Sequence, residues 1–333
     1  MSPGGFTSVI PKRIAAILAC PKCKSKPIID GAVFCAHCGT SYPIEGNVPI
    51  LHVENARREI EEEILKVKST KNLTSFSEAI SREKEGRFLL SPQYGSVDST
   101  TELPSFIYRI GKRLYPPAPV LNQVIGEKRQ PLVNKFRNGL ILNVGCGSDF
   151  IQEGIINFDL DLLPGVDVVG NGENLPFLDE QFDLIISQAV LEHVKRPRRI
   201  VNEIYRVLKH GGYIYVESPF LQEYHGFPLD FRRYTITGLE NLLSRFKKIE
   251  SGVCAGPSAT FGRIFREYLA SFSDNLYVHQ ILKILAGWLI FPLRYLDLYL
   301  NEKKYAHIIA MGIYYIGQKA DQRKSTDAAC IES

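Results

Sequence analysis

The sequence lacks a hydrophobic segment long enough to cross a membrane. Its longest charge-free apolar run, Ile284 to Leu293, is far shorter than the ~20 residues that a transmembrane helix needs, and Met1 to Ile10 lack the apolar core of a signal peptide. It also lacks an excess of either charge, because 40 basic residues stand against 36 acidic ones for a net charge of +4. No global field therefore favours a nucleic acid or membrane partner. We expect a cytoplasmic protein in which any membrane contact is local and peripheral.

The third glycine of a dinucleotide-binding loop is also missing. The apolar run Leu140 to Val144 ends in Gly145-Cys146-Gly147, and a second apolar stretch ends in the carboxylate of Asp159. Glycines allow the backbone to turn sharply against a ligand, and a carboxylate can bind both hydroxyls of a ribose. Because Phe150 holds the third glycine position, a pyrophosphate on a helix N-terminus is disfavoured. The pattern predicts a nucleoside cofactor of another kind.

Four of the seven cysteines form two Cys-x-x-Cys pairs, Cys20 with Cys23 and Cys35 with Cys38. Each pair can offer two thiolates to one tetrahedral ion, and Asp30-Gly31 between them is a hairpin turn signal. The redox alternative needs a Cys-x-x-Cys at the start of a helix in a thioredoxin-like unit, which the pattern does not show. We predict a zinc ribbon whose four sulfur ligands leave no open position, so that the metal stabilises rather than catalyses.

The segment after the second cysteine pair carries a resemblance. Tyr42-Pro43-Ile44 is followed by Pro49 and apolar residues, and Ala16 to Leu51 as a whole resembles the zinc ribbon of the small activator subunit shared by several tRNA and protein methyltransferases. The resemblance implies a methyltransferase partner, which here would lie in the same chain.

Composition divides the rest of the chain. We expect a zinc ribbon over 1–52, a helical and irregular linker over 53–130 that includes a charged helix from Glu54 to Lys68, a catalytic domain over 131–320, and a polar tail over 321–333. An apolar stretch from Phe106 to Leu114 leaves open a substrate-covering role for the linker.

The catalytic region alternates strand and helix signals, which predicts an α/β fold with a parallel sheet. A helix is expected from Arg198 to Lys209, stopped by Gly211-Gly212. The expected strands are Leu140 to Val144, Ile155 to Asp159, Leu184 to Ser187, Tyr213 to Ser218, Lys248 to Cys254 and His307 to Gln318.

Five motifs follow one another in a recognisable order. They are Leu142-Asn143-Val144-Gly145-Cys146-Gly147, Leu175-Pro176-Phe177, Gln181-Phe182-Asp183, Leu191-Glu192-His193-Val194 and Tyr205-Arg206-Val207-Leu208-Lys209-His210-Gly211-Gly212. This series resembles the class I S-adenosylmethionine-dependent methyltransferases, in particular the type 11 domain family that includes ubiquinone and menaquinone biosynthesis methyltransferases. The resemblance implies a Rossmann-like sheet with helices on both faces.

The same resemblance implies a cofactor site for S-adenosylmethionine. Gly145 and Gly147 would admit its methionine part, and Asp159, with Asp161 as a rival, would bind the ribose. The expected cofactor-binding residues are Asn143, Gly145, Cys146, Gly147, Asp159, Leu160, Asn171, Gly172, Glu173, Ser187 and Gln188. Asn143 and Asn171 stand where the family usually has Asp, and a neutral hydrogen bond is about half as strong as a charge-assisted one. We therefore expect weaker cofactor binding than is typical.

Catalysis needs alignment of the reactive sulfonium with the acceptor, and a base only where the acceptor loses a proton. The loop Ser218 to Thr235 follows an expected strand end and resembles that of methyltransferases found with surface-glycan enzymes. We predict His225 and Asp230 in this loop, and His193, for acceptor contact or proton removal. The alternative is that Asp230 only pairs with Arg232 to order the loop.

Between the last two expected strands, a helical insertion over about 261–303 is rich in apolar and aromatic residues. Because Pro292, Arg294 and Asp297 interrupt it, a spanning helix is disfavoured. A packing helix, a lid, a dimer face and an interfacial helix that touches a membrane through 281–300 stay open.

These observations favour a methyltransferase that uses S-adenosylmethionine and acts on a small-molecule, glycan or lipid-linked acceptor. The alternative acceptor is RNA or a translation protein, with phosphate contacts from Lys195, Arg196, Arg198 and Arg199. A further alternative, motivated by Asn143 and Asn171, is a cofactor-binding scaffold without turnover. The oligomeric state is open.

Overall fold

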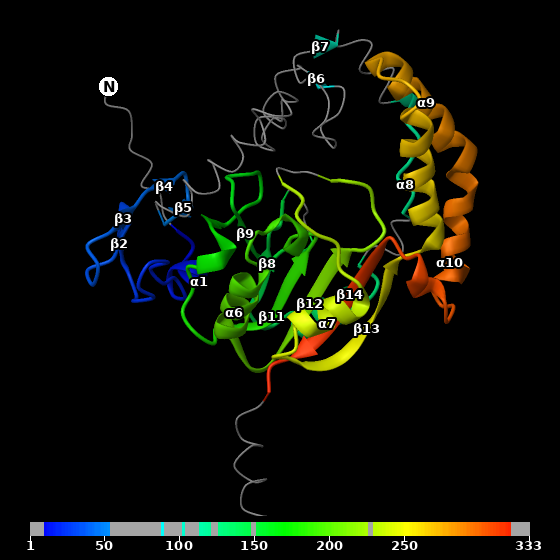
Figure 1. Cartoon of the computed structure of the whole chain (residues 1–333). Helices are drawn as coiled ribbons and strands as arrows, with labels where there is room; N and C mark the ends of the chain where they lie inside the picture. Colours follow the sequence, from blue (N-terminus) through cyan, green and yellow to red (C-terminus); the bar gives the residue numbers. More distant parts are fainter. Residues whose placement is uncertain are drawn as a thin grey trace, which may run out of the picture.

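A nine-stranded sheet forms the centre of the protein (Figure 1). The computed structural model describes residues 10–53, 88–89, 102–103, 113–120, 126–147, 151–225 and 229–320. Within these ranges the strand order is β13-β14-β12-β11-β8-β9-β10-β5-β4. The expected linker helix from Glu54 to Lys68 and the polar tail lie outside the described residues.

The sheet is parallel except near its ends. Its strands are β4 (Ile44–Glu45), β5 (Val48–Leu51), β8 (Ile141–Val144), β9 (Ile156–Asp159), β10 (Val168–Gly170), β11 (Phe182–Gln188), β12 (Leu208–Pro219), β13 (Lys247–Ala255) and β14 (Gly312–Gln318). From β5 through β12 each neighbouring pair is parallel, whereas β14 runs antiparallel to both β12 and β13. The carboxyl ends of β8, β9, β11 and β12 therefore share one edge, where ligands bind in such sheets.

Helices cover both faces of this sheet, and the predicted fold class is confirmed. The helices are α1 (Lys12–Ala15), α5 (Gln130–Lys135), α6 (Pro197–Val207), α7 (Ile236–Leu242), α8 (Pro257–Ala270), α9 (Leu276–Ile290) and α10 (Asp297–Leu300), with 3₁₀ turns η1 (Gly172–Asn174), η2 (Leu191–His193), η3 (Phe291–Leu296) and η4 (Ala306–Ile308). Helices α6 and α7 pack on one face and α5 on the other.

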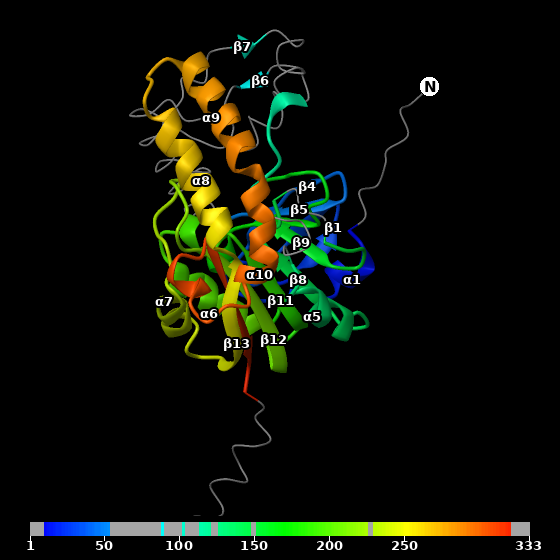
Figure 2. The same ribbon diagram turned by 90° about the vertical axis from the view of Figure 1, so that its right-hand side faces the viewer.

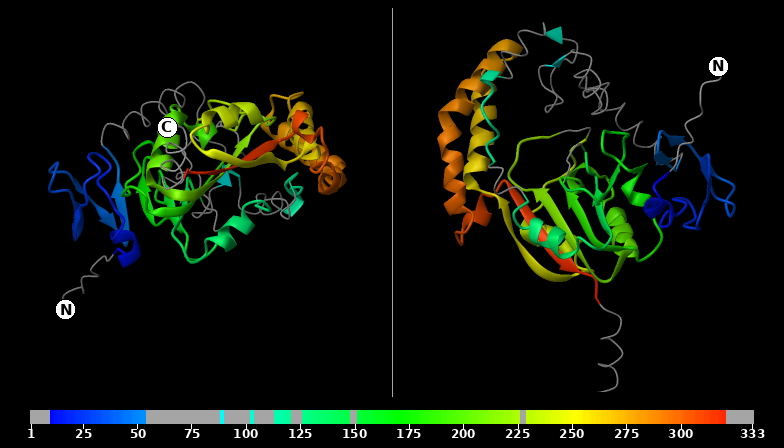
Figure 3. Two further views of the ribbon diagram at one scale, coloured as in Figure 1. Left: turned by 90° about the horizontal axis from the view of Figure 1, so that it is seen from below. Right: turned by 180° about the vertical axis from the view of Figure 1, so that it is seen from behind.

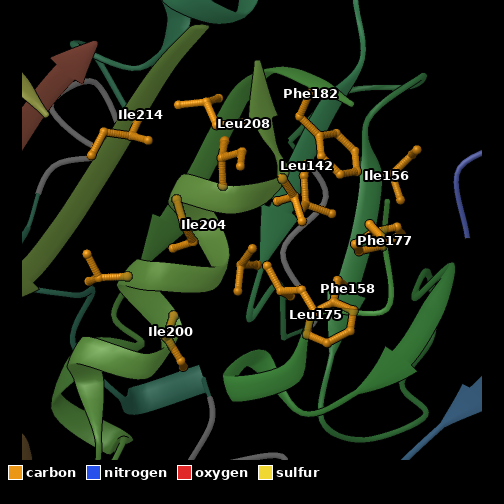
Figure 4. Close-up of a cluster of buried hydrophobic side chains, with 14 of the residues drawn as sticks. Leu142, Ile156, Phe158, Leu175, Phe177, Phe182, Ile200, Ile204, Leu208 and Ile214 are labelled. Carbon is orange, nitrogen blue, oxygen red and sulfur yellow. The ribbon is translucent and has the colours of Figure 1, made fainter. Parts of the chain in front are cut away.

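Alternation along the strands divides the core between the two faces. Leu142 of β8 packs with the α6 side, whereas its neighbour Ile141 packs with Val133 of α5. Helix α6 presents Ile200 and Ile204 to the sheet at helical spacing (Figure 4). Packed helices thus shield both faces of the sheet from water, as a parallel sheet requires.

Several expected boundaries are wrong. Helix α6 ends at Val207, because Leu208 already pairs with Phe182 of β11, so that Gly211-Gly212 lies within β12. The last strand begins at Gly312 rather than His307, and the helical insertion begins at Pro257 rather than 261. The short strand β10 was not expected, because three residues carry too little pattern.

The N-terminal ribbon that carries the four cysteines packs directly on the central sheet. Its remaining strands are β1 (Ile28–Asp30), β2 (Ala32–Phe34) and β3 (Ser41–Tyr42), and β1 and β2 form the predicted hairpin. Strand β5 pairs in parallel with β10, and the Ala19 N–H donates to the Pro176 carbonyl at 2.9 Å. Lys24 Nζ lies 2.7 Å from Glu203 Oε2 of α6. The sheet therefore crosses the boundary that the sequence places at residue 52.

Helices α8 and α9 form a hairpin at the opposite end of the molecule (Figures 2 and 3). They follow β13 and lead through η3, α10 and η4 back to β14. The ribbon and this helical hairpin thus flank the two ends of one sheet. Strands β6 (Phe88–Leu89) and β7 (Glu102–Leu103) pair apart from it. No helix among the described ranges is long and apolar enough to span a bilayer.

Candidate functional site

The loop after β8 depends on two glycines with left-handed backbone. Gly145 has φ +68° and Gly147 has φ +55°. A Cβ on Gly145 would lie 2.4 Å from Cγ2 of Val190, so the loop packs tightly on one side. A Cβ on Gly147 would meet no described atom within 4 Å. Gly147 therefore presents bare backbone to open space, which suits the close approach of a ligand.

Asp159 is fixed beside this loop at the end of β9. Its Oδ2 accepts the Gly147 N–H at 2.7 Å, and its Oδ1 accepts the Asp161 N–H at 3.2 Å. Burial raises the pKa of Asp159, opposed by these backbone donors. The structure thus brings the predicted ribose-binding carboxylate next to the predicted glycine loop, with Leu160 directly after it.

The two unusual asparagines lie in different settings. Asn143 is buried in β8, and its Nδ2 donates to Asn157 Oδ1 of β9 at 3.3 Å. An Asp at this position would be a desolvated carboxylate, so the amide suits the surroundings. Asn171 caps η1 by accepting the Glu173 N–H at 2.9 Å.

The Glu173 carboxylate forms ion pairs with two arginines. Its Oε2 lies 2.9 Å from Arg196 Nε and 3.7 Å from Arg199 Nη1. These two cations, expected to contact phosphates in the RNA alternative, are therefore already neutralised in part. The adjacent Gly172 packs against Ile200, because a Cβ there would lie 3.0 Å from Ile200 Cδ1.

The end of β11 has a strained backbone and a buried polar atom without a hydrogen-bond partner among the described residues. Ala189 has φ +52°, which is unfavourable for a residue with a Cβ, and such strain concentrates at functional sites. Ser187 Oγ is buried and has no hydrogen-bond partner in the described structure. Gln188 accepts from Arg129 and donates to Glu217 Oε2 of β12 at 2.8 Å. Sequence reasoning missed Arg129 and Glu217, because only the fold brings them to Gln188.

Asp230 stabilises the loop from Ser218 to Thr235, which we call the acceptor loop after its predicted role, through contacts inside that loop. It accepts the His225 N–H at 2.7 Å and forms an ion pair with Arg233, whose Nη2 donates at 2.5 Å. Arg232 instead donates to the Val194 and Lys195 carbonyls. The alternative of an Asp230–Arg232 pair is wrong, since the partner is Arg233.

Two histidines meet above β11. The rings of His193 and His225 lie 5.7 Å apart, and His193 Nδ1 contacts the Leu229 carbonyl. His225 Nδ1 is buried without a hydrogen-bond partner in the described ranges. Burial, with the positive charge of His193 and Arg263, lowers the pKa of His225 to about 4. His225 is therefore neutral near pH 7, with a ring nitrogen able to bind or accept a proton.

Glu192 is a site residue that sequence reasoning did not select, although it stands in a quoted motif. Its side chain is 1% exposed, and its Oε1 lies 3.8 Å from His193 Nε2 and has no hydrogen-bond partner among the described residues. Its Oε2 accepts a long hydrogen bond from Ser218 Oγ at 3.5 Å. Burial raises the pKa of Glu192 to about 8. Its neighbour His193 in the sequence was the only signal that could have found it.

The four cysteines of the ribbon form one cluster. The Sγ atoms of Cys20, Cys23, Cys35 and Cys38 all lie within 4.8 Å of one another. Two matching backbone turns hold them, with the Lys24 N–H bonded to the Cys20 carbonyl and the Gly39 N–H to the Cys35 carbonyl. This closed sulfur set is compatible with a tetrahedral zinc ion.

A comparison with protein families gives a match over the central part of the sheet. A family model described as Methyltransferase domain matches residues 142–216, from β8 through β12. The chain carries a methyltransferase domain. The match includes the Gly145 and Gly147 loop, Asp159 and Glu192, so the predicted family is confirmed over the part that forms the site.

Relatives match this methyltransferase domain in part. The phthiotriol/phenolphthiotriol dimycocerosates methyltransferase of Mycobacterium tuberculosis is 46% identical over 52 residues, 15% of this chain and 19% of that protein. A protein of Encephalitozoon cuniculi, named as a methyltransferase, is 35% identical over 102 residues, 26% of this chain and 49% of that protein. The chain thus spans less than half the length of these relatives.

Solved structures are similar to this chain at low sequence identity. Phosphoethanolamine N-methyltransferase 2 of Haemonchus contortus in complex with S-adenosylmethionine is similar over 59% of this chain and 53% of that chain. The identity is 16% and the TM-score 0.35.

The cysteine cluster predicts one zinc ion per chain. Cys35→Ser should reduce zinc content by at least tenfold and destabilise the fold, because metal binding is folding free energy in such ribbons. Elemental analysis and thermal unfolding measure both effects. Cys146→Ser, outside the cluster, serves as the control and should keep its zinc. Equal zinc content in the two variants would contradict the assignment.

Glu192 should make stability depend on pH. The folded pKa of about 8 lies above the ordinary 4.5, so wild-type stability falls as pH rises from 4.5 through 8, by at most about 1.4 kcal/mol per pH unit. Glu192→Gln should therefore gain stability relative to wild type as pH rises across this window. Urea unfolding at pH 5, 6.5 and 8 measures it. The exposed Glu153→Gln is the control, and parallel pH profiles for wild type and Glu192→Gln would refute the assignment.

Proposed function

We propose that the protein transfers the methyl group of S-adenosylmethionine to a small-molecule, glycan or lipid-linked acceptor. The observation that carries the proposal is the hydrogen bond from Gly147 to Asp159, which fixes a carboxylate beside open backbone within the matched domain. The loop would hold the methionine part and Asp159 the ribose. Asn171 and Glu173 would lie toward the adenine.

His225 is proposed as the group that receives the acceptor's proton. When bound, S-adenosylmethionine would supply the methyl group, and His225 Nδ1 would receive the proton that the acceptor oxygen or nitrogen loses. Its lowered pKa keeps this nitrogen unprotonated near neutral pH. Asp230 and Arg233 would act as positioning residues, since their contacts hold the His225 backbone.

A lipid-linked acceptor is supported by the helical hairpin. On α9, Ile281, Leu285 and Leu289 are 55%, 62% and 70% exposed, whereas Lys283 is 1% exposed. Lys283 Nζ pairs with Glu267 Oε1 of α8 at 2.7 Å. Apolar side chains thus point outward and charge points inward, the polarity expected of a surface that faces lipid. We infer peripheral membrane contact through 281–300 by a protein of the cytoplasm.

The cofactor proposal predicts the effect of Asp159→Asn. Binding of S-adenosylmethionine should weaken by about 10- to 100-fold, because a hydrogen bond to a charged group contributes about 1.5–3 kcal/mol. Isothermal titration measures the change. Asp161→Asn is the matched control and should bind within about threefold of wild type. A larger loss in Asp161→Asn would move the ribose contact to Asp161.

The acceptor class is tested with methyl-labelled cofactor and fractionated cell extract. Label should enter the lipid or glycan fraction, and His225→Gln should slow transfer by about 10²- to 10⁴-fold at unchanged cofactor affinity. The exposed His307→Gln is the control. Label in RNA or protein would establish the alternative acceptor, and no transfer to any fraction would favour the scaffold.

Membrane contact is tested by co-sedimentation with vesicles of phosphatidylglycerol and phosphatidylcholine. A triple replacement of Ile281, Leu285 and Leu289 by Ser should reduce binding at least tenfold, because burial of each side chain contributes about 1.5–3 kcal/mol. The control replaces three exposed apolar residues elsewhere, Ile28, Phe34 and Ile249, by Ser. Equal pelleting of both variants would refute the contact.

A further inference from the structure

A small cavity lies where the helical hairpin meets the segment 113–120. It is enclosed by α8, α9 and η3 together with Pro117 and Pro119, and two arginines line it, Arg266 and Arg294. The space open to the centre of a water-sized sphere is ≈ 10 Å³, about what one such sphere needs. The cavity therefore has room for one small occupant.

Arg266 is a buried cation whose Nε has no partner. Its side chain is 7% exposed, and Nη2 donates to the Tyr115 hydroxyl at 2.5 Å while the guanidinium lies 5.1 Å from the Tyr115 ring centre. Nε is buried and makes no hydrogen bond within the described structure. The Tyr115 hydroxyl accepts this hydrogen bond, but no carboxylate of the described residues forms an ion pair with Arg266.

Arg294, which is partly buried, approaches the same cavity from η3. Its Nη2 donates to the Val120 carbonyl at 3.3 Å, and the guanidinium lies over the Phe291 ring at 5.3 Å. Its Nε is also buried without a hydrogen-bond partner among the described residues. Two like charges thus line one small cavity, and no described carboxylate forms an ion pair with either of them.

Three acidic side chains in or beside the helical hairpin already have polar partners. Glu267 pairs with Lys283, and Glu223 pairs with Arg263. Asp297 accepts the Ser258 and Ala259 N–H groups, each at 2.9 Å. None of these carboxylates lies within ion-pair distance of Arg266 or Arg294 in the part of the chain that the structure describes. A counter-ion must therefore come from outside this set.

We propose that the cavity binds one small monovalent anion of halide size between Arg266 and Arg294. An unpaired buried charge is strongly unfavourable, and an unsatisfied buried N–H donor alone costs about 1–3 kcal/mol. A halide would offset one of the two positive charges that line the cavity and would accept from both Nε atoms. Phosphate and carboxylate ligands such as gluconate are excluded by the size of the cavity.

The anion would attach the hairpin to the segment that precedes α5. Contact there is close, since a Cβ on Gly287 would lie 2.2 Å from Pro116 Cγ, and Trp288 Nε1 donates to the Leu114 carbonyl at 2.7 Å. With the halide bound, the repulsion between the two arginines that line this junction would be reduced, because the anion lies between them. The site is independent of the proposed methyl transfer.

The test compares sodium chloride with sodium gluconate at equal ionic strength in urea unfolding of the full chain. Above the dissociation constant, each tenfold rise in chloride should lower the unfolding equilibrium constant about tenfold, the dependence of one bound anion. Arg266→Met should abolish this dependence, whereas Arg245→Met, on the exposed surface, should retain it. Equal chloride dependence in wild type and Arg266→Met would overturn the proposal.

A second measurement does not require a stable variant. Crystals of the wild-type protein grown in sodium bromide should show an anomalous peak in the cavity within hydrogen-bond distance of both Nε atoms. Density for water alone, or for a carboxylate of the chain, would overturn the proposal.

Discussion

The parallel alignment of β8, β9, β11 and β12 is the constraint on which the rest of the structure depends. It sends the glycine loop, Asp159, the strained Ala189 and the acceptor loop to one edge of the sheet. Residues far apart in the sequence, such as Asp159 and His225, come to that edge only because the strands share a direction. Both faces of the sheet must then be dry, which explains why α5, α6 and α7 carry apolar stripes.

The buried polar side chains at this edge of the sheet differ in whether they already have hydrogen-bond partners. Asp230 is buried but fully engaged by Arg233 and a backbone N–H, so it serves as a fixed anchor. Glu192 and His225 are buried with an unsatisfied atom each. Glu192 and His225 therefore keep hydrogen-bonding capacity for a ligand, whereas Asp230 has already used its own. Structural support and the proposed chemistry would thus be carried by different residues of the same region.

Features encoded by short, local patterns were predictable from the sequence. The two cysteine pairs, the Asp30-Gly31 hairpin and the glycine loop with Asp159 each depend on spacing within one segment. Glu192 was not predictable, because its burial depends on how distant segments meet. The Arg233 partner of Asp230 lies only three residues away, but the spacing does not distinguish it from the neighbouring Arg232. Strand β10 is too short to carry a periodic signal, and the addition of β5 to the sheet depends on an edge that exists only after the domain folds.

The pairing of β5 with β10 has a consequence for protein quality control. The ribbon covers what would otherwise be the exposed edge of a largely apolar parallel sheet, and open edges of this kind template pairing with other chains. If the cysteine cluster holds zinc, loss of the metal would loosen the ribbon and uncover β10. A shortage of zinc would then favour aggregation of this protein.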